Sequence, residues 1–203
     1  MNAVLLLLLL AAPLLPPPVS PPRPAVRAGD FRATPPAAAV PKPAAGPIAW
    51  SAARPLTVAD FQSRPSPGER LAALTSTNIK AGAACRDFVF SGTVEATFDP
   101  ATSWVRSPAT LTSALLRHEQ MHFDLTEVYA RRLRQRLVVF QARANCEKLQ
   151  PAFNNVTKPL YSEWDREQNR YDQETNHGLN TDRQAAWEQQ TQARLEQLKA
   201  FAQ

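Results

Sequence analysis

The sequence predicts an α+β fold in which a small, mostly antiparallel sheet precedes one long helix and further C-terminal helices. Between Ala49 and Val105, short segments such as RDFVFSGTVEATFD alternate apolar and polar residues and are separated by the turn signals SPGE, SGT and DPAT. Beyond residue 107 the apolar residues recur instead at the spacing of a helix. Strands followed by helices are typical of an α+β domain.

The N-terminus is interpreted as a secretory signal over residues 1–28. The apolar run VLLLLLLAAPLL from Val4 to Leu15 is shorter than the ~20 residues of a membrane span, and Val26-Arg27-Ala28 is the best small-residue cleavage site. Residues 29–47 are rich in proline and alanine and predict an extended linker, which leaves 48–203 as the folded domain. We therefore expect a secreted or periplasmic protein without stable membrane insertion.

Ser107 and Pro108 predict the start of the long helix, because serine favours the capping position and proline the first helical position. The helical pattern continues to about Cys146. A second helical region is expected from about Leu160, after QPAFNN, and NHGLN at residues 176–180 interrupts it before a polar final helix. One stripe of the long helix carries its apolar residues: Leu111, Leu115, Leu125, Tyr129, Leu133, Leu137 and Phe140.

Cys85 and Cys146 are the only cysteines of the chain. In an exported protein they predict one disulfide, which would tie the sheet region to the end of the long helix. Such a bond encloses about 60 residues and contributes ~4 kcal/mol in the chain-entropy estimate. The alternative is two buried free thiols.

Two of the three histidines, His118 and His122, lie in the middle of the apolar stripe, and Glu119 lies beside them. Residues four apart are one turn and about 40° apart on a helix, so both imidazoles can reach one ion. In this H-E-x-x-H pattern the imidazoles hold Zn²⁺, and the glutamate takes a proton from the metal-bound water. The alternative is two core histidines, but two imidazoles and a carboxylate on a buried stripe are costly to desolvate.

A catalytic zinc takes three protein ligands, so the third is expected from elsewhere in the chain. Asp124 and Glu127 point about 140° or more away from the histidines and are interpreted as hydrogen-bond partners or solvated surface. His177, before Gly178, is the first choice for the third ligand, and a helix-capping side chain is the alternative. Glu174 comes next, and three other acids stay open: Asp165, Glu167 and Asp172.

Two further elements are candidates for the site. Tyr171 is predicted to donate its phenol to the oxyanion that forms when water attacks a carbonyl, although an interfacial tyrosine more often belongs to the core. The segment GTVEATFDP, residues 92–100, would hold an extended peptide if it formed an exposed sheet edge. A strand that only covers the helix is an equal alternative.

Charge argues against nucleic acid as a partner. The formal net charge is +5, and it falls to +3 once Arg23 and Arg27 leave with the signal. RRLRQR at residues 131–136 is basic, but no aromatic platform accompanies it, and residues 160–203 hold eight acidic and five basic side chains. We interpret this basic segment as a solvated helix face.

The segment LLRHEQMHFDLTEVYARRLR resembles the signature helix of an uncharacterised family of secreted bacterial proteins regarded as zinc-dependent proteases of the zincin type. WSAARPLTVADFQSRP from Trp50, VEATFDPATSWV from Val94 and YDQETNHGLNTDRQAAW from Tyr171 are also similar to that family, so the resemblance covers roughly residues 50–187. It implies a zincin-like fold, His118 and His122 as zinc ligands, Glu119 as base, and a second signature, YDxETxHG, that returns to the site.

The sequence therefore predicts a secreted zinc hydrolase, a metallopeptidase that acts on a peptide or protein substrate. The alternative is a non-catalytic binding module of the cell envelope whose zinc site is structural or vestigial. Glu119 separates the two, because a structural zinc site is closed by four protein ligands and needs no base beside them.

Overall fold

The computed structural model describes residues 46–203. The signal and nearly all of the linker predicted from the sequence lie outside these residues. Within this part of the chain, no helix is both long enough and apolar enough to cross a membrane.

The strands form two small antiparallel sheets. β1 (Ile48–Ala49), β4 (Val89–Phe98) and β3 (Thr77–Arg86) form one sheet with β4 in the centre, and β2 (Ala73–Leu74) pairs with β5 (Trp104–Val105). Every second residue of β4 faces the helices, and the residues that do so are among the most buried of the chain: Phe90, Val94, Ala96 and Phe98. The alternation in the sequence thus predicted which face is covered.

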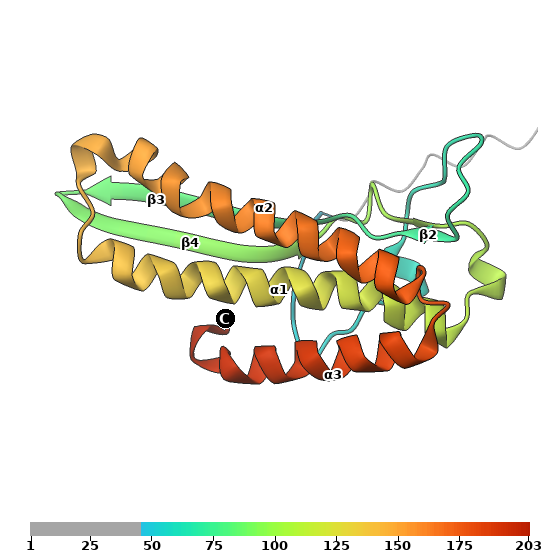
Figure 1. The fold of residues 1–203 in the computed structure, drawn as a ribbon. Helices are drawn as coiled ribbons and strands as arrows, with labels where there is room; N and C mark the ends of the chain where they lie inside the picture. Colours follow the sequence, from blue (N-terminus) through green and yellow to red (C-terminus); the bar gives the residue numbers. More distant parts are fainter. Residues whose placement is uncertain (1–45) are drawn as a thin grey trace, which may run out of the picture. The chain divides into compact units, whose positions relative to one another are not determined.

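The helices follow the sheets, as predicted, which makes the fold α+β (Figure 1). α1 (Ser113–Gln141) lies between α2 (Leu149–Thr175) and α3 (Thr181–Gln197) and also packs on β4. The predicted stripe of α1 forms part of the core, where Leu125 and Leu133 are 0 % exposed. Each such side chain contributes roughly 1.5–3 kcal/mol through burial.

The ends of the first two helices differ from the prediction. Ser107 and Pro108 begin a short 3₁₀ turn, and α1 starts after Thr112, whose hydroxyl accepts from the backbone N–H of Leu115 at 3.1 Å. α1 ends at Gln141 rather than near Cys146. α2 already begins at Leu149, so QPAFNN is helical. Pro151 is tolerated there because a backbone N–H in the first helical turn has no partner within the helix, so its absence costs no hydrogen bond.

The predicted interruption between α2 and α3 is confirmed. Asn176 ends α2 with a left-handed φ of +48°. The side chain of Asn180 begins α3 by accepting from the backbone N–H of Arg183 at 3.1 Å.

The basic segment of α1 is not the solvated face that the sequence predicted. Arg131 is 6 % exposed and Glu127 2 %, and the Arg131 Nε to Glu127 Oε1 distance is 2.8 Å. Arg134 also binds Glu127, at 3.0 Å, and donates to the carbonyl oxygen of Phe201, while Arg131 donates to that of Leu195. The C-terminal residues cover this face, and the arginines fix them to α1.

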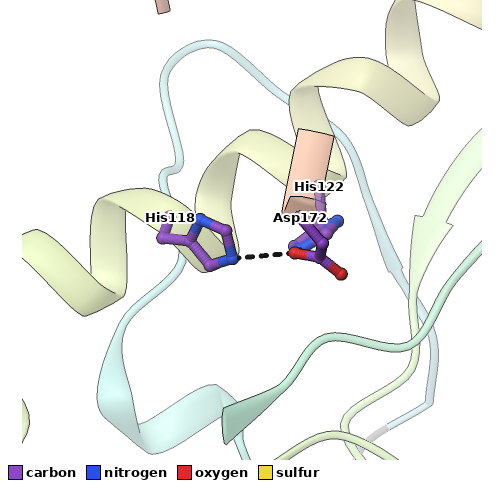
Figure 2. Close-up of side chains that lie close together, drawn as sticks. All are labelled: His118, His122 and Asp172. Atoms are coloured by element: carbon purple, nitrogen blue, oxygen red, sulfur yellow. Dashed lines mark hydrogen bonds and ion pairs between the residues drawn. The ribbon is translucent and has the colours of Figure 1, made fainter. Parts of the chain in front are cut away.

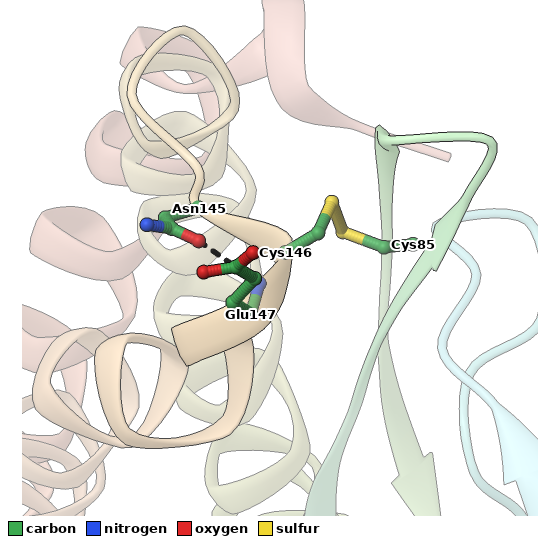
Figure 3. The surroundings of a disulfide bond; sticks show 4 residues. All are labelled: Cys85, Asn145, Cys146 and Glu147. Carbon is green, nitrogen blue, oxygen red and sulfur yellow. Dashed lines mark hydrogen bonds between the residues drawn. A yellow bond between two sulfur atoms is a disulfide. The ribbon is translucent and has the colours of Figure 1, made fainter.

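The disulfide between Cys85 and Cys146 is formed, with Cα atoms 5.8 Å apart, as the sequence predicted (Figure 3). It joins the end of β3 to the short turn between α1 and α2. A disulfide of this kind is typical of proteins outside the reducing cytoplasm.

Replacing Cys85 and Cys146 together by serine should lower the free energy of unfolding by about 4 kcal/mol, because the unfolded chain regains the entropy of an open loop. Chemical denaturation of the variant and of the reduced wild type measures this loss. Equal stability of oxidised wild type and variant would contradict the prediction.

Candidate metal centre

The imidazoles of His118 and His122 and the carboxylate of Asp172 meet at one point (Figure 2). α1 supplies both histidines, one turn apart, and Asp172 lies in the last turn of α2. Asp172 Oδ1 lies 3.0 Å from Nε2 of His118 and 3.0 Å from Nε2 of His122. Within residues 46–203, these three side chains form the group whose ligand atoms all lie within 4.8 Å of one another.

Two glutamines determine which ring nitrogen of each histidine carries hydrogen. Gln168 Oε1 lies 2.7 Å from Nδ1 of His122, and Gln184 Oε1 lies 3.2 Å from Nδ1 of His118. The amide nitrogen of Gln168 donates to the carbonyl oxygen of His122, and that of Gln184 donates to Glu188. The amide oxygens therefore face the rings, and each Nδ1 is the donor, because an amide oxygen can only accept.

This orientation leaves three acceptors facing one another. With hydrogen on Nδ1, a neutral imidazole presents a lone pair at Nε2, so both rings direct lone pairs at the Asp172 oxygen. At 3.0 Å these groups repel one another unless a proton or a metal ion lies between them. Ligand atoms of a tetrahedral zinc site with bonds of about 2.0–2.1 Å are about 3.3–3.4 Å apart. The two His–Asp distances would therefore have to lengthen by a few tenths of an ångström for these donors to hold Zn²⁺.

The pKa values of His122 and Asp172 show that the charged forms of these two side chains stabilise each other. Burial opposes the protonated form of His122, but the hydrogen bond and charge of Asp172, with the charge of Glu119, outweigh burial and raise the pKa of His122. Burial also opposes the charged form of Asp172, but His118 and His122 in their protonated forms hold the pKa of Asp172 well below its usual range through their hydrogen bonds and charges. The carboxylate is thus charged and favours a cation.

Tyr171 supports the histidines from behind. It is 0 % exposed and stacks on the His118 ring with centroids 4.7 Å apart. Its hydroxyl donates to Gln184 Oε1 at 2.7 Å, and burial raises the pKa of Tyr171 far above its usual value. The hydroxyl also lies 3.2 Å from the carbonyl oxygen of His118, and its predicted contact with an oxyanion stays a prediction.

The turn between α2 and α3 packs directly on His118. Asn176, His177 and Gly178 have φ angles of +48°, +52° and +81°, so three consecutive residues are left-handed. A Cβ atom added to Gly178 would lie 3.0 Å from Cβ and Cγ of His118. Glycine permits both the backbone conformation and this close approach.

Glu119 lines a pocket of about 350 Å³ together with the two histidines and Asp172. Its side chain is nearly buried, and Oε2 accepts a hydrogen bond from the Thr75 hydroxyl at 2.7 Å. Residues 71–77 form another wall of this pocket and include β2 and the start of β3. The carboxylate thus lies beside the candidate metal ligands and lines an open space.

The segment GTVEATFDP does not line this pocket. It belongs largely to β4, which lies between β1 and β3 and packs on α1. Of the two expectations, the strand that covers the helix is the one found, and the backbone beside the site comes from residues 71–77 instead.

Comparison with known proteins identifies the family of the chain. Residues 59–178 match the pattern of a family described as "Bacterial protein of unknown function (DUF922)", and this match spans more than half of the sequence. The chain belongs to the DUF922 family. No curated protein and no solved structure matches it.

The DUF922 match begins just before the first wall of the pocket and ends at Gly178, so it contains His118, Glu119, His122 and Asp172. The second signature, YDQETNHG, does return to the histidines, since Tyr171, Asp172 and Gly178 all contact them or lie against them. The family segment therefore coincides with the part of the fold that builds the candidate centre.

The other predicted ligands lie at different distances from the centre. His177 lines the pocket, and its Nδ1 lies 3.6 Å from Asp172 Oδ1, but its side chain is 55 % exposed. Asp165 also lines the pocket.

Glu167 and Glu174 point away from the pocket, because Glu167 binds Arg194 and Glu174 binds Arg183 and Trp187. Asp124 accepts from Trp50 and Gln120, and Glu127 lies in the network with Arg131 described above.

Sequence reasoning missed Thr75, Gln168 and Gln184. Gln168 and Asp172 continue a spacing of four residues that starts at the buried Leu160 and the partly buried Trp164, so they share one face of α2. That spacing would have favoured Asp172 over the neighbouring acids. Thr75 and Gln184 come from distant segments, and no local pattern marks them.

Replacing Gly178 by alanine should destabilise the fold by about 1–3 kcal/mol, because the new Cβ has a strained φ and meets His118. Thermal unfolding and the histidine resonances in NMR spectra measure the effect. Gly68→Ala is the matched control, since Gly68 also has a positive φ of +85° but no atom within 4 Å of an added Cβ. Equal losses in both variants would show that contact with His118 adds nothing.

Proposed function

We propose that this DUF922 protein is a secreted zinc-dependent hydrolase, a metallopeptidase that cleaves amide bonds. One observation carries the proposal: two imidazole lone pairs and a charged carboxylate oxygen converge, and each imidazole is held by a hydrogen bond at its other nitrogen. Metal-binding histidines characteristically donate their second ring N–H to a fixed acceptor in this way. The resemblance to zincin-type proteases supports the same function.

His118, His122 and Asp172 are the proposed protein ligands. Zinc bound there would polarise a substrate carbonyl and lower the pKa of water toward ~7. Gln168 and Gln184 keep both rings oriented, and Tyr171 holds Gln184 in place. His177 remains a predicted ligand that would join from the rim of the pocket.

Glu119 is the proposed general base. It is held by Thr75 and has no ion pair within the described residues, so its carboxylate remains able to accept a proton from water. It lies on the wall of a pocket rather than in a closed shell of ligands. This arrangement favours catalysis over the alternative of a structural zinc site, which would be closed by four protein ligands.

An extended peptide is the proposed substrate. Residues 71–77 offer an extended backbone wall beside Glu119, and the exposed Leu74 provides an apolar contact there. The disulfide fits a protein that acts in the periplasm or outside the cell, where such bonds persist.

Elemental analysis should find one zinc per chain in the wild type and in Glu119→Gln, and almost none in His118→Ala, His122→Ala or Asp172→Asn. Each of these last three variants removes one of the three proposed protein ligands. Asp165→Asn is the matched control, because Asp165 lines the same pocket outside the ligand group.

The His177→Ala variant separates the two candidate third ligands. Retention of zinc in this variant and its loss in Asp172→Asn would assign the ligand to Asp172, and the reverse result would assign it to His177. A folded wild type that binds no zinc even after reconstitution would overturn the proposed function.

Peptide-library hydrolysis tests the base. Glu119→Gln should keep its zinc and lose at least about 100-fold in rate, because no carboxylate remains to accept the proton. Thr75→Val should also keep its zinc and lose about tenfold, since Glu119 is no longer held in place. Unchanged hydrolysis in Glu119→Gln would refute its role as base.

A further inference from the structure

A second pocket, of about 760 Å³, lies on the other side of α2 from the metal site and is bordered by all three helices. Its wall is dominated by charge, because four arginines face only two glutamates and leave a surplus of two positive charges. Tyr129, Asn169 and Gln173 complete it. The four arginines are Arg132 of α1, Arg166 and Arg170 of α2, and Arg194 of α3.

Two of these guanidinium groups are fixed in position before any ligand binds. Arg194 makes two hydrogen bonds of 2.9 Å to the carboxylate of Glu167 and lies 5.6 Å from the centre of the Tyr129 ring. Arg132 lies 4.6 Å from the same ring centre and binds Glu163 at 2.6 Å. Fixed side chains lose little further entropy when a ligand binds them.

The arginines are more numerous than the carboxylates that can neutralise them. Glu167 already serves both Arg194 and Arg170, and Glu163 serves both Arg132 and Arg136. Glu174 lies 3.9 Å from Arg170 but also binds Arg183 at 2.6 Å. The side chain of Arg166 has no hydrogen bond, ion pair or ring contact with any residue of the described part of the chain. Like charges brought together in this way repel one another unless an anion joins them.

We infer that this pocket binds a phosphate group. A guanidinium presents paired N–H donors whose geometry matches phosphate oxygens, and guanidinium groups from three helices border one space. Arg166 and Arg170 are four residues apart on α2, so they lie on the same face of this helix, and both line the pocket. The pocket is larger than a single phosphate ion, so the group belongs to a larger molecule, either soluble or a lipid headgroup.

Nucleic acid does not suit this pocket as well as an isolated phosphate group does. The aromatic ring in the wall, Tyr129, is approached by Arg132 and Arg194, so it offers no free surface on which a base could stack.

The inference does not depend on the proposed hydrolase. Asn169 lines both this pocket and the one that contains Glu119, so the two sites flank the same turn of α2. None of the arginines of the second pocket contacts His118, His122 or Asp172. Phosphate binding can therefore be tested in protein without metal.

The test is calorimetric titration of the metal-free chain with inorganic pyrophosphate at constant ionic strength. Wild type should bind with a Kd below about 1 mM, and Arg166→Gln should weaken binding about tenfold by removing the unpaired guanidinium. Arg166 has no partner to lose, so this variant should fold normally. Arg143→Gln is the matched control: it removes the same charge at an exposed site that lies outside the pocket, and it should bind like wild type.

Vesicles containing phosphatidylglycerol, compared with phosphatidylcholine alone, identify the source of the phosphate. Retention on the anionic vesicles that Arg166→Gln abolishes would point to a lipid headgroup, and pyrophosphate binding without retention would point to a soluble ligand. Absence of pyrophosphate binding in folded wild type, or equal weakening in Arg166→Gln and Arg143→Gln, would overturn the inference. Binding of single-stranded DNA in preference to pyrophosphate would overturn it in favour of nucleic acid.

Discussion

The convergence of two imidazole nitrogens on one carboxylate oxygen is the constraint around which the structure is organised. Bringing Nε2 of His118 and Nε2 of His122 to 3.0 Å from Asp172 Oδ1 requires the C-terminal end of α2 to lie against α1. Gln168, Tyr171 and the left-handed turn at Gly178 all serve that approach. A proton or a metal ion between these acceptors relieves their repulsion, so the packing of α2 on α1 and the proposed chemistry depend on the same three side chains.

The local parts of this arrangement could be predicted from the sequence. The apolar stripe of α1 and the four-residue spacing of His118 and His122 depend only on the period of one helix. The interruption at residues 176–180 depends only on the conformations that asparagine and glycine tolerate. The disulfide could be predicted because the chain has two cysteines and the sequence indicates an exported protein.

The remaining parts depend on how helices pack, which no local pattern contains. The choice among Asp172, Glu174 and His177 is set by which side of α2 faces α1, and the prediction that α2 begins near Leu160 obscured that face. The solvated surface expected for Arg131 became buried because the C-terminal residues return to cover it. Long-range partners such as Thr75 for Glu119 lie too far apart in sequence for any spacing rule.

The buried network of Glu127 with Arg131 and Arg134 bears on the rotation of α1 about its own axis. The network binds one side of the helix to Leu195 and Phe201, while the histidines lie on another side, more than one turn earlier in the chain. A turn of α1 by one residue, about 100°, would separate both sets of partners at once. The contacts with Leu195 and Phe201 thus oppose rotation of α1 about its axis. The direction of the imidazoles is therefore set partly by contacts far from them.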